Sequence, residues 1–202
     1  DRGLVMQNSN GDFSVSGATF IGNALGSATT ALDIQNSEAN VTFNILQILD
    51  AEGVAGSPAG VNLVGNLAGA TNTALHTYGL IDIRSSGEVG FFANNNTNIR
   101  ILDGTINSEG AAAISLEESA WTVELESVSS QGSPDNGIRL VNAVAVDNNT
   151  FIVDNQLALV TPGDAGTIEE AGTSAALLQN AGQVRFRGML FDDNNSDIVL
   201  TN

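Results

Sequence analysis

The sequence predicts an all-β fold in which short parallel strands stack into a solenoid, a parallel β-helix of about eight irregular coils. Three observations predict it. Short alternating apolar runs recur in a repeated order, turn-forming pairs such as Asn10-Gly11 and Asp103-Gly104 separate them, and the one helix-like segment, residues 168–178, is interrupted by Gly172. We expect residues 1–202 to form a single solenoid domain, either a segment of a longer repeat array or a stacking subunit.

The first run of each coil has the form apolar, any residue, apolar, any residue, asparagine. The strict copies begin at Leu4, Leu32, Ile138, Ala176 and Ile198, and the looser copies are Val61-x-Leu63, Ile81-x-Ile83 and Ile114-x-Leu116. Alternation places every second side chain on one buried face, so each run predicts a strand. Spacings of roughly 20 to 40 residues fit the coils of a solenoid.

Two further runs follow the first in most coils. The second runs are Phe13-x-Val15, Val41-x-Phe43, Val89-x-Phe91, Val123-x-Leu125, Val144-x-Val146 and Val184-x-Phe186. The third runs are Phe20-Ile21, residues 45–48, Ile99-x-Ile101, Phe151-x-Val153 and Leu190-Phe191. Three runs per coil predict three parallel sheets, although an Asn-Gly pair between two runs is also compatible with a local hairpin.

The core and the loops follow from the same pattern. The Gly-, Ala- and Thr-rich segments 64–77 and 160–173 predict loops that bulge from one edge of the solenoid. The expected core includes the apolar positions of the strict first runs, namely Leu4, Met6, Leu32, Ile34, Ile138, Leu140, Ile198 and Leu200.

The asparagines that end the strict runs share one phase of the repeat: they are Asn8, Asn36, Asn142, Asn180 and Asn202. Asparagine tolerates a left-handed turn, and its side chain can bond to the same side chain one coil away, at about 4.8 Å. We therefore predict a structural ladder. The alternative is a row of amides that binds a ligand.

The net charge of the chain restricts the molecules that it can bind. The chain has 23 acidic and 6 basic residues, all six of them arginine, and a net charge of -17. Such a surface repels phosphate, so we expect neither nucleic acid nor an anionic membrane as partner. No run approaches the roughly 20 apolar residues of a membrane span. Divalent cations are the ions that this charge attracts, and the absence of cysteine excludes disulfides.

No residue pattern predicts catalysis, and no cofactor is expected. His76 is the only histidine, and no Gly-x-Ser-x-Gly motif accompanies it. The acid-rich segment 192–197 (Asp-Asp-Asn-Asn-Ser-Asp) could hold calcium, but it lacks the glycine and the distant glutamate of an EF-hand loop, and a solvated turn is the simpler interpretation. Glu117-Glu118, Glu124 and Glu126 offer paired carboxylates of the kind that hydrolyse glycosides, but solvent-facing strands carry such pairs by default.

The stretches ALDIQNSEANVTFNILQI and GIRLVNAVAVDNNTFIVDN resemble the repeats of the right-handed parallel β-helix superfamily, in particular those of bacterial surface adhesins and autotransporter-like passenger regions. The resemblance implies a right-handed solenoid on the cell surface, and it is weak evidence for activity because one solenoid can carry many functions. Members that cleave acidic polysaccharides combine aspartates with a Gly-His-Gly and an Arg-Ile-Lys segment, which are absent here although Asp192-Asp193 supplies two carboxylates.

Two functions remain in view. The first is a non-enzymatic extracellular structural or adhesive scaffold of a surface protein, sheath or filament. The alternative is a carbohydrate-active β-helix that binds or cleaves a neutral polysaccharide. The expected partner is the protein itself: Ile198-x-Leu200 could stack on Leu4-x-Met6 of a following molecule or on further repeats of the same chain. Surface glycans are a further candidate partner.

Overall fold

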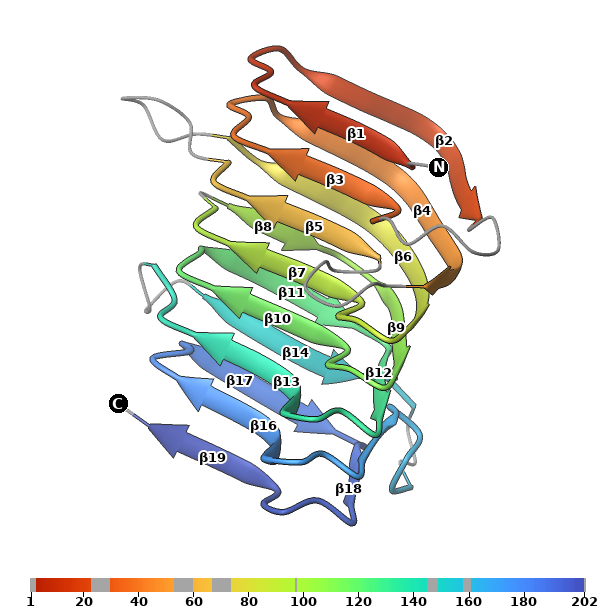
Figure 1. Cartoon of the computed structure of the whole chain (residues 1–202), viewed down its shortest axis with the longest axis vertical. Coiled ribbons are helices and arrows are strands. Elements are labelled where there is room, and N and C mark those ends of the chain that lie inside the picture. Colours follow the sequence, from red (N-terminus) through yellow and green to blue (C-terminus); the bar gives the residue numbers. More distant parts are fainter. Residues whose placement is uncertain are drawn as a thin grey trace.

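The computed structural model describes residues 3–22, 30–52, 60–66, 74–96, 98–144, 149–157 and 161–201. Throughout these ranges the chain forms strands and turns, with no helix. The strands build two sheets, here called sheet A and sheet B, and every pairing is parallel (Figure 1). The prediction of an all-β fold with parallel strands is confirmed.

Sheet A has eight strands. In spatial order they are β1 (Leu4–Gln7), β3 (Leu32–Gln35), β5 (Val61–Val64), β7 (Phe91–Asn94), β10 (Ile114–Glu117), β13 (Asn136–Val141), β16 (Ser174–Gln179) and β19 (Ile198–Thr201). Spatial order follows sequence order, and neighbouring strands pair in a constant register, so that Leu4 lies opposite Leu32 and Leu178 opposite Leu200. This sheet forms the front of the molecule in Figure 1.

Sheet B has eleven strands and receives the chain between successive strands of sheet A. They are β2 (Phe13–Gly22), β4 (Val41–Glu52), β6 (His76–Ser86), β8 (Ile99–Ile101), β9 (Gly104–Glu109), β11 (Trp121–Leu125), β12 (Ser127–Gln131), β14 (Thr150–Asp154), β15 (Thr167–Glu169), β17 (Gln183–Arg187) and β18 (Leu190–Asp192). Each passage from sheet A to sheet B and back advances the chain by one strand position. This topology is compatible with a β-helix or solenoid.

The expectation of three sheets is wrong, because the second and third runs belong to one sheet. Strand β6 pairs with β8 through its first residues and with β9 through its last residues. The two rows of short strands are therefore joined by β6, and the long, curved strands β4 and β2 extend the same sheet beyond it (Figure 1).

The run pattern placed one coil in the wrong sheet. Ile81-x-Ile83 lies in β6 of sheet B, and the strand of sheet A in that coil is β7, where Phe91 and Ala93 point inward. Val89 precedes β7 and forms no strand. Alanine is a weak apolar marker, and this hid the first run of that coil.

The prediction of the third runs is wrong in two coils and holds for Phe20-Ile21, residues 45–48 and Leu190-Phe191. Ile99-x-Ile101 and Phe151-x-Val153 pair with β11 and so lie in the row of the second runs. The true third strands are β9, β12 and β15, whose core residues Ile106, Val128 and Ile168 each stand alone among polar neighbours. Segment 160–173, expected as a loop, contains β15. Val144 is exposed outside any strand, and Val146 lies outside the described residues.

The core lies between the two sheets. Leu32, Ile34, Ile138 and Leu140 are fully buried, as predicted. Ile198 and Leu200 are 43% and 74% exposed, so the prediction that they are buried is wrong, and Leu4 and Met6 are only half-buried. These four residues belong to β1 and β19, each of which pairs with one strand only among the described residues.

Candidate functional site

Four asparagines of the expected ladder directly follow strands of sheet A. Asn8, Asn36, Asn142 and Asn180 have φ values of 51°, 50°, 52° and 46°, the left-handed conformation expected for them. Asn202 lies outside the described residues. The Nδ2 atom of Asn180 donates to Oδ1 of Asn142 at 3.3 Å.

The row is not uniform in sequence. Pairing along sheet A places Gly65, Asn95 and Glu118 in the same phase, between Asn36 and Asn142, and all three also have positive φ values. The common property of the row is thus its backbone conformation. Asparagine is the residue that most often adopts this conformation in the row. Glycine and glutamate interrupt the row, so it is not an unbroken line of amide side chains that could bind a ligand.

A second polar row lies one residue further along the chain in five neighbouring coils, and the sequence analysis did not predict it. This inner ladder consists of Ser9, Ser37, Asn66, Asn96 and Ser119. Asn66 donates through Nδ2 to Oδ1 of Asn96 at 2.8 Å and accepts at Oδ1 from the Ser37 amide at 3.0 Å, and the Asn96 amide donates to Oγ of Ser119 at 3.0 Å.

All but Ser9 of the inner ladder are buried, and its bonds link neighbouring coils. It therefore fixes the turn that leads from sheet A to sheet B. The signal in the sequence is a Ser or Asn directly after the left-handed residue in five coils, while Ala143 and Ala181 take this place after Asn142 and Asn180.

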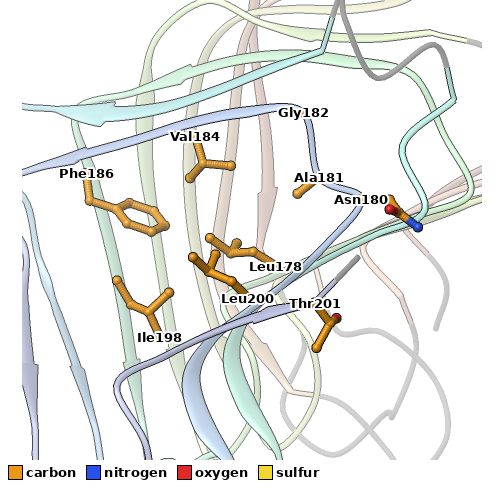
Figure 2. A pocket seen from close by; sticks show the side chains of 9 residues that line it. All are labelled: Leu178, Asn180, Ala181, Gly182, Val184, Phe186, Ile198, Leu200 and Thr201. Carbon is orange, nitrogen blue, oxygen red and sulfur yellow. The ribbon is translucent and has the colours of Figure 1, made fainter.

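An open hollow lies at the C-terminal end of the two sheets (Figure 2). It measures about 500 Å³ and is lined mainly by apolar side chains: Leu178, Ala181, Val184, Phe186, Ile198 and Leu200, with Asn180, Gly182 and Thr201 at its margin. The side chains of Ile198 and Leu200 come from β19, and those of Val184 and Phe186 from β17. We call this feature the end hollow, and it leaves the apolar side chains of Ile198 and Leu200 exposed at the edge of sheet A.

A groove lies on the outer face of sheet A, and we call it the sheet A groove. It has a volume of about 310 Å³. On the sheet it is lined by Phe92, Ser115, Glu117 and Arg139, and along its side by the turns 87–89, 110–112 and 133–136. These turns precede β7, β10 and β13, so the groove crosses three neighbouring strands.

The polar groups of the groove are bonded to one another. Glu117 accepts at Oε1 from Nε of Arg139 at 2.7 Å and from Oγ of Ser115 at 3.2 Å. Ser115 of β10 lies between Phe92 of β7 and Arg139 of β13 on the neighbouring strands. The three side chains form one row on the outer face of sheet A. Of the glutamates considered from the sequence, Glu117 alone lies here. Glu118 occupies the following turn, and Glu124 lies on β11 of sheet B.

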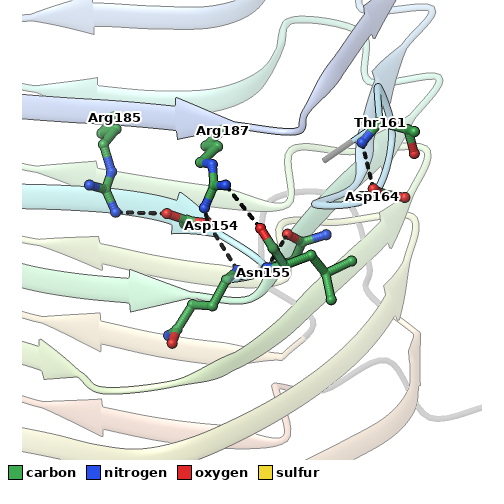
Figure 3. A network of polar contacts seen from close by, with 8 residues as sticks. Asp154, Asn155, Thr161, Asp164, Arg185 and Arg187 are labelled. Carbon is green, nitrogen blue, oxygen red and sulfur yellow. Dashed lines mark hydrogen bonds and ion pairs between the residues drawn. The ribbon is translucent and has the colours of Figure 1, made fainter. Parts of the chain in front are cut away.

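A second charged network joins β14 to β17 in sheet B (Figure 3). Arg185 and Arg187 donate to the two carboxylate oxygens of Asp154 at 2.8 and 3.1 Å. The amide of Gln156 also donates to Asp154 at 2.9 Å, and this bond is the main cause that lowers the pKa of the Asp154 carboxyl. The two arginines lower this pKa further, and partial desolvation opposes them.

The neighbouring turn is held in the same way. The Thr161 amide donates to the Asp164 carboxylate at 2.6 Å, which lowers the pKa of Asp164 (Figure 3). Each carboxylate of this region is therefore bound by groups of the protein itself, which points to a structural role.

The acid-rich segment 192–197 forms a turn beside the preceding coil. Asn194 accepts at Oδ1 from the Ala171 amide and donates through Nδ2 to the Ile168 carbonyl, both at 2.9 Å. Asn195 donates to the Gly172 carbonyl. The amides thus bond to the backbone of the preceding coil. Within the described ranges, no three His, Asp or Glu side chains lie close enough together to hold a metal ion.

His76 lies in the core, at the start of β6, between Val41 and Ile99 of the adjacent strands. It is 1% exposed, and neither ring nitrogen has a hydrogen-bond partner. Burial lowers the pKa of His76 to about 4, because charging the ring there costs its hydration. Tyr78 is fully buried two residues on, and burial raises its pKa. In the part of the chain that the structure describes, no hydroxyl or carboxylate is hydrogen-bonded to this histidine.

Comparison with known proteins finds no relative: the chain matches no family model, no curated protein and no solved structure. A helix long and apolar enough to cross a membrane is absent from the described ranges.

Proposed function

We propose that the chain is a non-enzymatic extracellular scaffold, structural or adhesive, of a bacterial surface protein, sheath or filament, built as a right-handed β-solenoid of about eight coils. The observation that carries the proposal is the unbroken parallel pairing of sheet A from β1 to β19. It provides a rod in which each coil supports the next, as in repeat proteins that serve as extended scaffolds.

The polar side chains also support a structural role. The inner ladder, the Asp154 network and Asn194 all bond to a neighbouring coil. They strengthen the contact between coils, and their donors and acceptors are occupied by the protein itself.

Association through the ends follows from the same geometry. The partner is a further repeat of the same chain or another copy, stacked end to end, because β19 carries an unpaired edge in the described structure next to the apolar end hollow. Pairing of β1 on β19 would continue sheet A. Sheet A ends with β19, which lies one strand position beyond β17 and β18, the last strands of sheet B. A contact that also covers Val184 and Phe186 therefore needs one further strand beside β17.

Light scattering of the purified chain over a range of concentrations tests this association. We expect the mean mass to rise with concentration and Leu200→Asp to abolish the rise, because a charge would enter the apolar end. Leu102→Asp is the matched control, since Leu102 is 42% exposed on the side of the solenoid and should not matter. A monomer at every concentration contradicts the end-to-end proposal.

Turnover assays test the non-enzymatic part separately. We expect pectin, polygalacturonate and neutral polysaccharides to remain uncleaved. Cleavage that Glu117→Gln, Asp192→Ala or Asp193→Ala abolishes would overturn the proposal and favour a carbohydrate-active solenoid.

A further inference from the structure

The sheet A groove contains an aromatic side chain, Phe92, on the outer face of the sheet. Phe92 points outward from β7 and is half-buried, whereas the other aromatic residues of the neighbouring coils, such as Tyr78 and Phe91, are in the core. Ser115 follows Phe92 in the row and is small, so a recess remains between the Phe92 ring and the Arg139 side chain. Ser115 is 3% exposed although it faces outward, which places it at the floor of this recess.

A fixed pair of charged groups stands beside the ring. The Arg139–Glu117 contact uses only Nε of the arginine and Oε1 of the glutamate. Within the described ranges, the two terminal amino groups of Arg139 and the second carboxylate oxygen of Glu117 have no protein partner. Since the pair orients both side chains, these donors and the acceptor are held in position before any ligand arrives.

The chemistry of the groove selects a class of ligand. An aromatic face and a few fixed polar groups in a concave site are typical of small-molecule binding. Neighbouring donors and acceptors match the hydroxyl groups of a sugar ring, whose C–H face packs on an aromatic ring. Glu88 and Asp135 add negative charge beside the Glu117–Arg139 pair, so an acidic sugar is disfavoured.

We propose that the sheet A groove binds a neutral saccharide, with a sugar ring against Phe92 and hydroxyl groups bonded to Arg139 and Glu117. The groove crosses β7, β10 and β13, which are spaced by about 4.8 Å, so it accommodates more than one sugar unit along the solenoid axis. This inference goes beyond the scaffold function and holds whether or not the ends associate.

Titration of the isotope-labelled chain with oligosaccharides, followed by amide chemical shifts in NMR spectra, tests the site. The probes are cellotetraose, maltotetraose and mannotetraose, with tetragalacturonate and tetramethylammonium as the acidic and cationic comparisons. We expect at least one neutral probe to shift amides of β7, β10 and β13 at concentrations up to about 10 mM. Neither Phe92→Ala nor Arg139→Gln should unfold the protein, and each should weaken this binding about tenfold or more.

Matched variants at other surface sites complete the experiment. Phe20→Ala removes an aromatic ring that is 68% exposed on β2, and Arg84→Gln removes an arginine paired with Asp82, and both should leave binding unchanged. The proposal is overturned if no neutral probe binds, if binding survives in Phe92→Ala and Arg139→Gln, or if tetragalacturonate or tetramethylammonium binds the groove as tightly. A Phe92→Ala or Arg139→Gln chain that has lost its native NMR spectrum would also contradict the assignment, because the replaced side chain would then be structural.

Discussion

The residue after each strand of sheet A from β1 to β16 has a left-handed backbone, and its identity matters less than its conformation. Four of these positions are the predicted asparagines, while Glu118 adopts the same conformation with φ of 44°. A side chain with a Cβ atom is strained there by roughly 1–2 kcal/mol, and asparagine reduces that strain through local hydrogen bonds. Glu118 is exposed, so no buried contact offsets its strain.

We therefore predict that Glu118→Asn raises the free energy of unfolding by about 0.5–1 kcal/mol. Chemical denaturation measures it. Glu124→Asn makes the same change of charge at an exposed strand position and should give no gain, because asparagine is a poor strand former. Equal gains in both variants would show that relief of negative charge, and not the backbone, is responsible.

His76 is the second residue whose surroundings predict a measurable effect. Its pKa is about 4 in the fold and 6.5 when unfolded, so between these values the unfolded chain binds more protons. The stability contributed by the neutral ring is fully present above pH 6.5 and falls as the pH drops through 6.5 toward 4. The loss by pH 4 amounts to about 3 kcal/mol.

Urea denaturation of the wild-type chain and of His76→Leu between pH 7 and pH 4 checks this. Leucine should remove the pH dependence that belongs to His76 and be tolerated in the core, because the imidazole nitrogens have no partner to lose. A wild-type loss that begins only below pH 4 would instead point to carboxylates such as Asp154, whose pKa is lowered.

At the scale of elements, sheet B is continuous in β6 and divided at the next coil. The division falls between β8 and β9, at Leu102 and Asp103, and is followed by Gly104 with φ of 128°. A Cβ atom on Gly104 would lie 2.0 Å from the carbonyl oxygen of Ile81 in the adjacent strand. Only glycine allows the chain to turn this corner while remaining hydrogen-bonded to β6.

Gly104→Ala should therefore destabilise the protein by about 2–4 kcal/mol, since it combines a clash with a strained backbone. Thermal unfolding followed by circular dichroism measures the loss. Gly11→Ala is the control, because a Cβ atom at Gly11 meets nothing within 4 Å, and its effect should stay within about 0.5 kcal/mol. Similar losses in both variants would contradict the role assigned to this corner.

Strands with two apolar residues in alternation could be predicted from the sequence. Strands with a single apolar core residue could not. Leu32 and Ile34 identified β3 directly, while β9 and β12 each have one aliphatic core residue among serine, threonine and asparagine. The joining of the second and third runs into one sheet depends on the continuity of β6, which pairs with both β8 and β9 and has no periodic signal that marks it as one strand. For the same reason the sheet A groove was missed: Phe92, Ser115 and Arg139 become neighbours only through the pairing of three strands.

For the molecule as a whole, charge and apolar ends act in opposite directions. A net charge of -17 makes any two copies repel each other, and this repulsion keeps the side surfaces apart. The end hollow offers apolar area that favours contact. Association should consequently be confined to the ends and should depend on how strongly the charge is screened.

The salt dependence follows with a definite sign. The Debye length falls from about 30 Å at 0.01 M salt to about 8 Å at 0.15 M, so like charges on two approaching copies are screened while apolar contact at the ends is retained. We predict that the apparent association constant rises as sodium chloride increases from 0.01 to 0.15 M, as measured by sedimentation equilibrium. Leu200→Asp should remain monomeric throughout this range, because it places charge on the apolar end itself. Association that instead weakens as salt is added would show that attraction between unlike charges, and not burial of Ile198 and Leu200, holds the copies together.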